Sequence, residues 1–196
     1  MKKLVLATHN RDKFKEMTQA LSGLGWEIFP AFEFPGVPDV VEDGSTLEEN
    51  SLKKAKEISQ FTGLTALSDD TGLFIDALNG DPGIYAARFA GEKCTYQDNV
   101  NKVLKLMTGV PIGARRAVFR TVITVYEPSG KADQVAGEVA GIITEKAMTE
   151  KGFGYDPIFM PEGFSKVFSL MTLEEKNQVS HRGRALQKAR LILSKA

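Results

Sequence analysis

Two adjacent aspartates inside an apolar stretch are the residues of this sequence that most directly indicate chemistry. Asp69 and Asp70 stand in "LSDDTGLFIDAL", residues 67–78, where the apolar pattern breaks and then resumes. Asp, Thr and Gly favour tight turns, so a simple reversal of the chain fits these letters. A metal or acid/base site fits them as well, because ligands of open α/β sheets lie beyond the carboxyl ends of the strands.

A second stretch, "ATHNRDK", has the arrangement of an anion site. A strand that runs straight into a helix presents unpaired backbone N–H groups and the positive end of the helix dipole. Asn10 is the predicted N-cap, and Lys13 adds a positive charge in the first helical turn. An ordinary capped helix with surface basic residues is the competing interpretation. No "GxxxxGK[ST]" or "GxGxxG" pattern opens this helix, so it is neither a P-loop nor a dinucleotide fingerprint.

A lysine lies on the predicted inward face of the helix that opens with "STLEE". Leu47, Ile58 and Phe61 define that face, and Lys54 shares their helical phase. Burying a lysine is costly without an anionic partner, so Lys54 indicates a cleft that receives negative charge. A side chain that passes the edge of the core to reach water fits equally well. Glu42, in the preceding loop, could reach the same cleft.

Lys53, the neighbour of this lysine, is expected to face solvent. Lys53 lies four residues after Glu49, an arrangement typical of a solvated ion pair on a helix surface. Only Lys54 is therefore predicted to face the cleft.

Two motifs near the C-terminus combine aromatic and basic side chains. In "GFGYDP", residues 152–157, rings that bracket a glycine can form a stacking face, and Asp156 is held extended by the proline that follows. A core-packing turn also explains this motif. In "EKNQVSHRGRA", Ser180 is the predicted cap of a helix whose first turn carries His181 and Arg182. Cations are disfavoured there, which indicates a compensating anion or a functional role, although a surface histidine is also compatible.

Strands that alternate with helices position these candidates, which is the pattern of an α/β fold. The predicted elements are a strand over residues 3–8, a helix from 11, a helix from 45 to about 62, strands over 64–69 and 72–78, a helix over 95–107, a hairpin over 117–143 and a helix from 180. The hairpin makes the predicted sheet mixed. No break in composition separates two independent domains.

Composition excludes several classes of protein. The chain has 196 residues, of which 42% are hydrophobic and 26% are charged, as in ordinary globular proteins. Its 25 basic residues balance 25 acidic ones, so a nucleic-acid polymer is not the expected partner. Cys94 is alone and no Cys/His spacing resembles a zinc site, which fits the cytoplasm. The first apolar run stops at Ala7, so neither a signal peptide nor a membrane segment is expected.

Six motifs in order resemble the inosine triphosphate pyrophosphatase family, and the likeness covers essentially the whole chain. The motifs are "THNRDK", "EENSLKKA", "LSDDTGLFIDAL", "GDPGIYAARFAG", "GFGYDPIF" and "EEKNQVSHRGRAL". The resemblance implies one nucleotide pyrophosphatase domain over residues 1–196, with a mixed central sheet, flanking helices and two lobes around an active-site cleft. It also implies a homodimer that hydrolyses dITP, ITP and XTP to the monophosphate and pyrophosphate with Mg²⁺.

The resemblance also assigns a role to each matching residue. The residues expected to hold the triphosphate are Thr8, His9, Asn10, Arg11, Asp12, Lys13 and Lys54. Those expected to bind the nucleoside are Thr71, Phe153, Gly154, Tyr155, Asp156, Lys176, His181 and Arg182. Glu42 and Asp70 would hold Mg²⁺, and Asp70 would also accept the proton of the attacking water. Asp69 would support these ligands without contacting the metal itself. His9 stands where many members have glycine, and its side chain is expected to narrow the phosphate loop.

The two aspartates cannot both face a cleft while their strand stays regular, because adjacent strand residues point to opposite faces. Thr71 and Gly72 are predicted to end that regularity. Two other functions remain open: hydrolysis of pyrimidine or other modified nucleotides, and non-catalytic nucleotide sensing. A sensor has no need for Glu42 and Asp70 together with the basic phosphate residues, so this set favours an enzyme.

Overall fold

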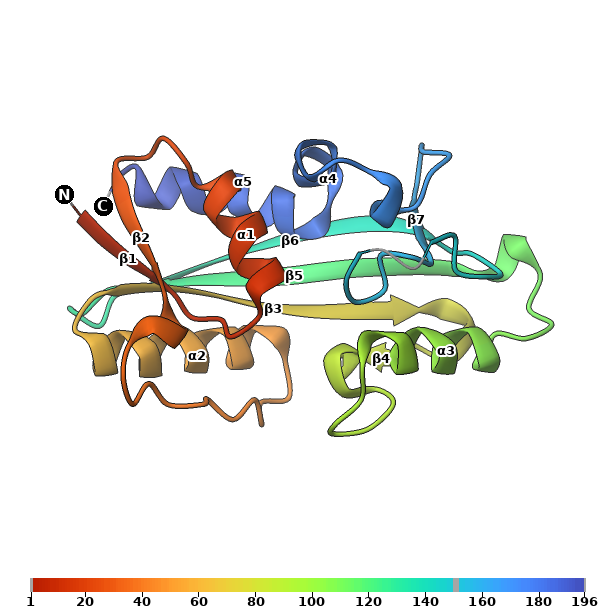
Figure 1. Ribbon diagram of the computed structural model, residues 1–196, viewed down its shortest axis with the longest axis horizontal. Coiled ribbons are helices and arrows are strands. Elements are labelled where there is room, and N and C mark those ends of the chain that lie inside the picture. Colours follow the sequence, from red (N-terminus) through yellow and green to blue (C-terminus); the bar gives the residue numbers. More distant parts are fainter. Residues whose placement is uncertain (1, 150–151, 196) are drawn as a thin grey trace. The chain divides into compact units, whose positions relative to one another are not determined.

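The structure is a computed structural model that describes residues 2–149 and 152–195 (Figure 1). The predicted domain over residues 1–196 thus includes residues 1, 150, 151 and 196, which lie outside the described residues. The chain divides into two compact units. The first unit comprises Met1–Asp70, Thr121–Gly137 and Arg182–Ala196, and the second comprises Thr71–Arg120 and Glu138–His181.

The described residues form a mixed sheet of seven strands, in the order β2-β1-β3-β5-β6-β7, with β4 paired to β3. The strands are β1 (Lys2–Leu6), β2 (Trp26–Pro30), β3 (Thr65–Ile75), β4 (Pro82–Gly83), β5 (Arg116–Tyr126), β6 (Ala132–Ile143) and β7 (Phe159–Pro161). The helices are α1 (Arg11–Ala20), α2 (Leu47–Thr62), α3 (Tyr96–Leu106), α4 (Leu173–Val179) and α5 (His181–Leu193). β1 pairs in parallel with β2 and β3, whereas β4 and β7 pair antiparallel, so the predicted mixed α/β class is confirmed.

In the first unit the strands are covered on both faces. Leu4 of β1 belongs to a core with Met17 of α1 and Leu186 of α5. Val5, the next residue, points the other way and belongs to a core with Ile58 of α2. Helices α1 and α5 therefore cover one face of this part of the sheet and α2 covers the other (Figure 1). Burial on both faces explains why "LVLA", residues 4–7, is a continuous apolar run.

An aromatic cluster forms the core of the second unit. Phe119 of β5 lies edge-on to Phe159 of β7 with ring centroids 4.7 Å apart, and Phe168 stacks on Phe159 at 5.2 Å. Val103 of α3 belongs to the same core. This packing anchors β7 and the chain that leads into it, which carries the "GFGYDP" motif.

The prediction of two separate strands around the aspartates is wrong. β3 is one continuous strand, Thr65–Ile75, and a short 3-10 turn follows it. Thr71 and Gly72 extend this strand instead of ending it. A Cβ on Gly72 would lie 2.9 Å from the carbonyl oxygen of Gly83 on β4, so glycine permits the close pairing of β4. The polar residues "DDTG" therefore belong to the strand and contact its neighbours, and they do not form a turn.

Three smaller features differ from the sequence expectations. Phe61 lies in the last turn of α2 and is 46% exposed, although the rest of the predicted inward face is buried. The spacing of Leu21 and Leu24 after Met17 predicts that both belong to the helix from residue 11, but α1 ends at Ala20 and both residues follow it. Strand β2 was not predicted, since four of its five residues are half-buried and show no alternation.

Candidate functional site

The turn from β1 into α1 gathers the predicted phosphate residues at one helix N-terminus. Asn10 caps α1, because its Oδ1 accepts hydrogen bonds from the backbone N–H groups of Asp12 at 2.9 Å and Lys13 at 3.2 Å. The Thr8 hydroxyl in turn accepts from the backbone N–H of Asn10 at 3.1 Å. The predicted cap is confirmed, and the turn presents the positive end of the helix dipole to an incoming anion.

The two large side chains of this turn point toward other partners. His9 Nδ1 lies 3.8 Å from a carboxylate oxygen of Asp39, and the His9 side chain is 48% exposed. The guanidinium of Arg11 lies over the ring of Phe32, 5.6 Å from its centroid.

Asp69 and Asp70 point to opposite faces of β3, as neighbours in a regular strand must. Asp69 Oδ2 lies 3.1 Å from Lys13 Nζ on α1 and accepts two hydrogen bonds from Arg182 on α5, both at 3.1 Å. Asp70 faces α2, where its Oδ1 lies 3.7 Å from Lys54 Nζ. One strand thus supplies a carboxylate to each helical layer of the first unit.

Asp69 belongs to a buried charge cluster. Arg182, which was predicted to recognise the base, donates to Asp69 and also to Glu16 at 2.6 Å, and all three residues are at most 3% exposed. Burial alone would raise the pKa of Asp69, but the charges of Lys13, Arg182 and Lys54 outweigh it and hold that pKa well below its usual value. Glu16 gave no signal in the sequence, because its partner lies 166 residues away.

Lys54 is the centre of the other carboxylate group. Its Nζ donates to Glu42 Oε1 at 2.7 Å and to the backbone oxygen of Asp69 at 2.6 Å. Lys54 is only 9% exposed, so its predicted inward phase is confirmed. Burial alone would lower the pKa of Lys54, but Asp70, Glu42 and Asp69 raise it, so the ammonium stays charged. Burial raises the pKa of Asp70, the direction that makes a carboxylate a stronger proton acceptor.

The carboxylates of Glu42 and Asp70 fit the donor set of a hard cation. Both approach the same ammonium group, which shows that this position accommodates positive charge. The described residues contain no group of three or more His, Cys, Asp or Glu side chains able to hold a metal ion. Mg²⁺ is commonly bound through one or two carboxylates, several waters and substrate phosphates, so two carboxylates suffice.

The predicted ion pair between Glu49 and Lys53 is wrong. Lys53 pairs with Asp43 at 2.6 Å. Glu49 accepts from the backbone N–H and the hydroxyl of Ser45, at 2.7 and 2.8 Å. A backbone donor just before a helix has no partner within the helix, so it competes successfully for this carboxylate.

The neighbouring lysines should differ in function. Lys54→Ala removes a buried cation with three oxygens around it, so we expect kcat/KM for dITP to fall roughly 10- to 100-fold, the value of a charged hydrogen bond. Lys53→Ala removes only an exposed pair and should be nearly silent. Steady-state kinetics of both folded variants would show this, and equal losses would contradict the assignment of Lys54.

In the second unit, three predicted base residues meet around one ammonium group. Lys176 Nζ donates to Asp156 Oδ2 at 2.5 Å and lies over the ring of Phe153, 4.3 Å from its centroid. Lys176 and Asp156 are each 5% exposed. The ion pair and the ring hold the ammonium in a defined position, and an ammonium group can only donate hydrogen bonds.

The other predicted base residues have different surroundings. His181 stacks on Phe119 with centroids 4.4 Å apart and an interplanar angle of 14°. Tyr155 is buried, its hydroxyl donates to the Ala86 carbonyl at 2.8 Å, and burial raises the pKa of the phenol. Gly154 has φ +60°, a conformation that favours glycine, and Thr71 is half-buried on β3. Phe119 was missed because an aromatic in an apolar strand cannot be told from core.

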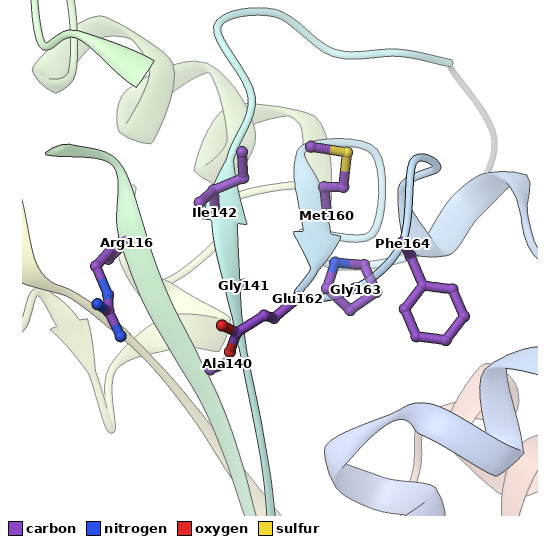
Figure 2. A pocket seen from close by; sticks show the side chains of 9 residues that line it. Arg116, Ala140, Gly141, Ile142, Met160, Glu162, Gly163 and Phe164 are labelled. Carbon is purple, nitrogen blue, oxygen red and sulfur yellow. The ribbon is translucent and has the colours of Figure 1, made fainter. Parts of the chain in front are cut away.

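The second unit also contains a pocket of about 320 Å³, and no residue predicted to be functional lines it. Figure 2 shows Arg116 and Phe164 on opposite sides of the pocket, with the Glu162 carboxylate between them. Its lining includes Gly141, where a Cβ would meet the backbone oxygen of Met160. No side chain of the "GFGYDP" or "SHRGRAL" motifs lines this pocket.

The fold is that of the Ham1 proteins. A solved Ham1 protein from Coxiella burnetii matches with a TM-score of 0.89 and 37% identity over 100% of both chains. The Staphylococcus aureus Ham1 protein matches with a TM-score of 0.86 and 34% identity over 99% of both chains.

The chain belongs to the Ham1 family, whose sequence profile matches residues 4–191. A dITP/XTP pyrophosphatase from Desulforamulus reducens is 46% identical, over 98% of this chain and 96% of the relative. One from Geobacter sulfurreducens is 44% identical, over 95% and 94%. The resemblance expected from the six motifs is confirmed. No helix in the described part of the chain is long and apolar enough to cross a membrane.

The two aspartates should have opposite effects on the stability of the metal-free protein. The lowered pKa of Asp69 means that its ionised form stabilises the fold above the unfolded pKa, and that this stability is lost as the pH falls. Asp69→Asn should therefore lower the free energy of unfolding at pH 7 by roughly 1.5–3 kcal/mol. The raised pKa of Asp70 means that its contribution is lost as the pH rises, so Asp70→Asn should raise that free energy.

Urea unfolding of both variants and the wild type at pH 7 measures these changes. A shift of the same sign in both variants would contradict the contrast between the two faces of β3.

Proposed function

We propose that this protein hydrolyses dITP, ITP and XTP to the nucleoside monophosphate and pyrophosphate, and so removes unusual purine nucleotides from the nucleotide pool. The observation that carries the proposal is the pair of aspartates on β3, each set opposite a lysine on a different face. Membership of the Ham1 family and relatives named dITP/XTP pyrophosphatase support it.

The triphosphate is held at the N-terminus of α1. The residues for this role are those of the turn, Thr8–Lys13, together with Lys54. Backbone N–H groups and the helix dipole favour phosphate oxygens there. Lys13 already bridges to Asp69, so this carboxylate positions the ammonium group that meets the phosphates.

Glu42 and Asp70 are the residues that would hold Mg²⁺. When bound, such a cation neutralises charge on the phosphate chain and so favours attack by water. The contribution of the chain itself is to keep the two carboxylates close together, which the shared contact with Lys54 achieves.

Proton removal from water is the second requirement of the reaction. The water oxygen forms a bond to the α-phosphorus, the bond from this phosphorus to the α–β bridging oxygen breaks, and pyrophosphate leaves. Asp70 takes the proton of the attacking water, and burial raises its pKa in the direction that favours this transfer.

The base is recognised by Lys176 with Phe153 and Asp156, and His181 supports this group. Inosine and xanthosine carry an oxygen at purine position 6, whereas adenosine carries an amino group. The Lys176 ammonium only donates hydrogen bonds, so it pairs with the 6-oxygen, whereas the 6-amino group offers it no acceptor. Guanine shares the 6-oxygen, so its rejection must depend on the 2-position.

We further propose a homodimer in the cytoplasm. The family resemblance supports the dimer, and a lone cysteine without a pairing partner in the chain supports a reducing compartment. Light scattering after size-exclusion chromatography gives the oligomeric state directly.

A substrate panel tests the proposed activity. Purified protein with Mg²⁺ is given dITP, XTP, dATP, dGTP, dUTP and a methylated nucleotide, and kcat/KM is measured for each. The proposal expects dITP and XTP to be the best substrates. A preference for dUTP or the methylated nucleotide would replace it with a related hydrolase activity, and binding without turnover would replace it with a sensor.

A further inference from the structure

The loop that carries Glu42 is fastened to α2 by four successive contacts. Each loop residue meets a helix residue, and the helix partners move back toward the N-terminus as the loop advances. These contacts are Glu42 to Lys54 at 2.7 Å, Asp43 to Lys53 at 2.6 Å, Gly44 N–H to Asn50 Oδ1 at 2.8 Å, and Ser45 N–H to Glu49 Oε2 at 2.7 Å.

The contact made by Asn50 differs from its neighbours. Asn50 is 1% exposed, whereas the side chain of Asp43 is 67% exposed and Glu49 lies at the surface. Exposed ion pairs are screened and contribute little. Asn50 and Glu49 both hold the main chain of the loop, at Gly44 and Ser45, but only Asn50 does so from a buried position. Asn50 therefore restrains the path of the loop two residues after Glu42.

The loop and the helix approach each other closely at this contact. A Cβ on Gly44 would lie 2.7 Å from Asn50 Oδ1 and 2.8 Å from Glu49 Cβ. Glycine at position 44 and asparagine at position 50 are therefore matched, and a change in either residue must displace the loop.

We propose that Asn50 is a positioning residue for the metal site, because it holds the loop so that the Glu42 carboxylate stays beside Lys54 and Asp70. Without this hydrogen bond the loop keeps only its exposed contacts and the side-chain pair of Glu42 itself. The loop must then be ordered when a cation binds, and the free-energy cost of this ordering weakens cation binding. The inference rests on the proposed function, which assigns Glu42 and Asp70 to Mg²⁺.

Two variants break the contact from opposite sides. Asn50→Leu removes the acceptor at similar volume, and Gly44→Ala pushes the loop away from an intact Asn50. We measure Mn²⁺ binding to nucleotide-free protein by the EPR signal of the free ion. Each variant should weaken Mn²⁺ about tenfold or more, as is typical when a partner of a metal ligand is lost. The double variant should bind Mn²⁺ about as tightly as the single variant with the lower Mn²⁺ affinity, because both substitutions remove the same contact.

The chain offers a matched control on another helix. Asn99 occupies the fourth position of α3 after the cap Thr95, as Asn50 does in α2 after Thr46. Its Oδ1 accepts from the backbone N–H of Ala90 at 2.7 Å, and it is 2% exposed. Asn99→Leu should reduce thermal stability as Asn50→Leu does but leave Mn²⁺ affinity unchanged.

Kinetics separate the inference from a general loss of structure. In Asn50→Leu the Mg²⁺ concentration at half-maximal rate should rise about tenfold, while kcat at saturating Mg²⁺ stays near the wild-type value. Wild-type Mn²⁺ affinity in Asn50→Leu and Gly44→Ala, or equal weakening in Asn99→Leu, would overturn the inference alone. A wild-type protein that neither binds Mn²⁺ nor releases pyrophosphate would overturn the proposed function as well.

Discussion

Asp70→Asn is expected to reduce turnover of dITP by ~10²- to 10⁴-fold, because it removes the proton acceptor and one of the two metal carboxylates. The substitution keeps the shape of the side chain. Binding of the nucleotide should survive better, since Lys13, Lys54 and the N-terminus of α1 still meet the phosphates. Asp69→Asn should lose only roughly 10- to 100-fold, because Asp69 positions Lys13 without taking the proton itself.

A magnesium titration of both variants separates these effects. Turnover of dITP is measured at each concentration after circular dichroism has shown that both proteins are folded. A greater loss in Asp69→Asn, or near-normal activity of Asp70→Asn at saturating Mg²⁺, would mean that the proton acceptor has been assigned to the wrong aspartate.

The second large effect concerns the base. We expect kcat/KM for dITP to exceed that for dATP by ~10⁴-fold, because a site built to donate to the 6-oxygen is left without an acceptor by the 6-amino group. Lys176→Met should lower kcat/KM for dITP roughly 10- to 100-fold and leave dATP almost unchanged. The preference between the two substrates should shrink by the same factor.

Lys166→Met is the matched control for this experiment. Lys166 also pairs with a carboxylate, that of Glu175 at 2.7 Å, but the pair is exposed. Its loss should leave the preference for dITP unchanged. An unchanged preference in Lys176→Met, or an equal drop in Lys166→Met, would remove Lys176 from base recognition.

Local rules predicted much of this fold. Asn10 was recognised as a cap because its side chain bonds to N–H groups two and three residues away. The inward phase of Lys54 follows from the spacing of residues along one helix, and the first strand follows from its run of consecutive apolar residues. Each of these features depends on neighbours in the sequence, so the sequence alone predicts them.

Features that depend on distant partners were not predicted. Asp69 and Asp70 were expected to interrupt a strand, yet β3 is continuous, because Lys13 and Arg182 neutralise one carboxylate and Lys54 approaches the other. Arg182 lies 113 residues after Asp69, so no local pattern shows their contact. Glu49 contacts Ser45 instead of the expected Lys53. This contact depends on the path of the loop before α2, which the spacing of residues along the helix does not describe.

Phosphorus NMR of a dITP reaction tests the central claim most directly, because it shows which bond breaks. With Mg²⁺ present, the account predicts that dIMP and pyrophosphate appear together from the first time point, in equal amounts. Sequential appearance of dIDP and orthophosphate would contradict it, since water would then attack the terminal phosphorus and not the α-phosphorus.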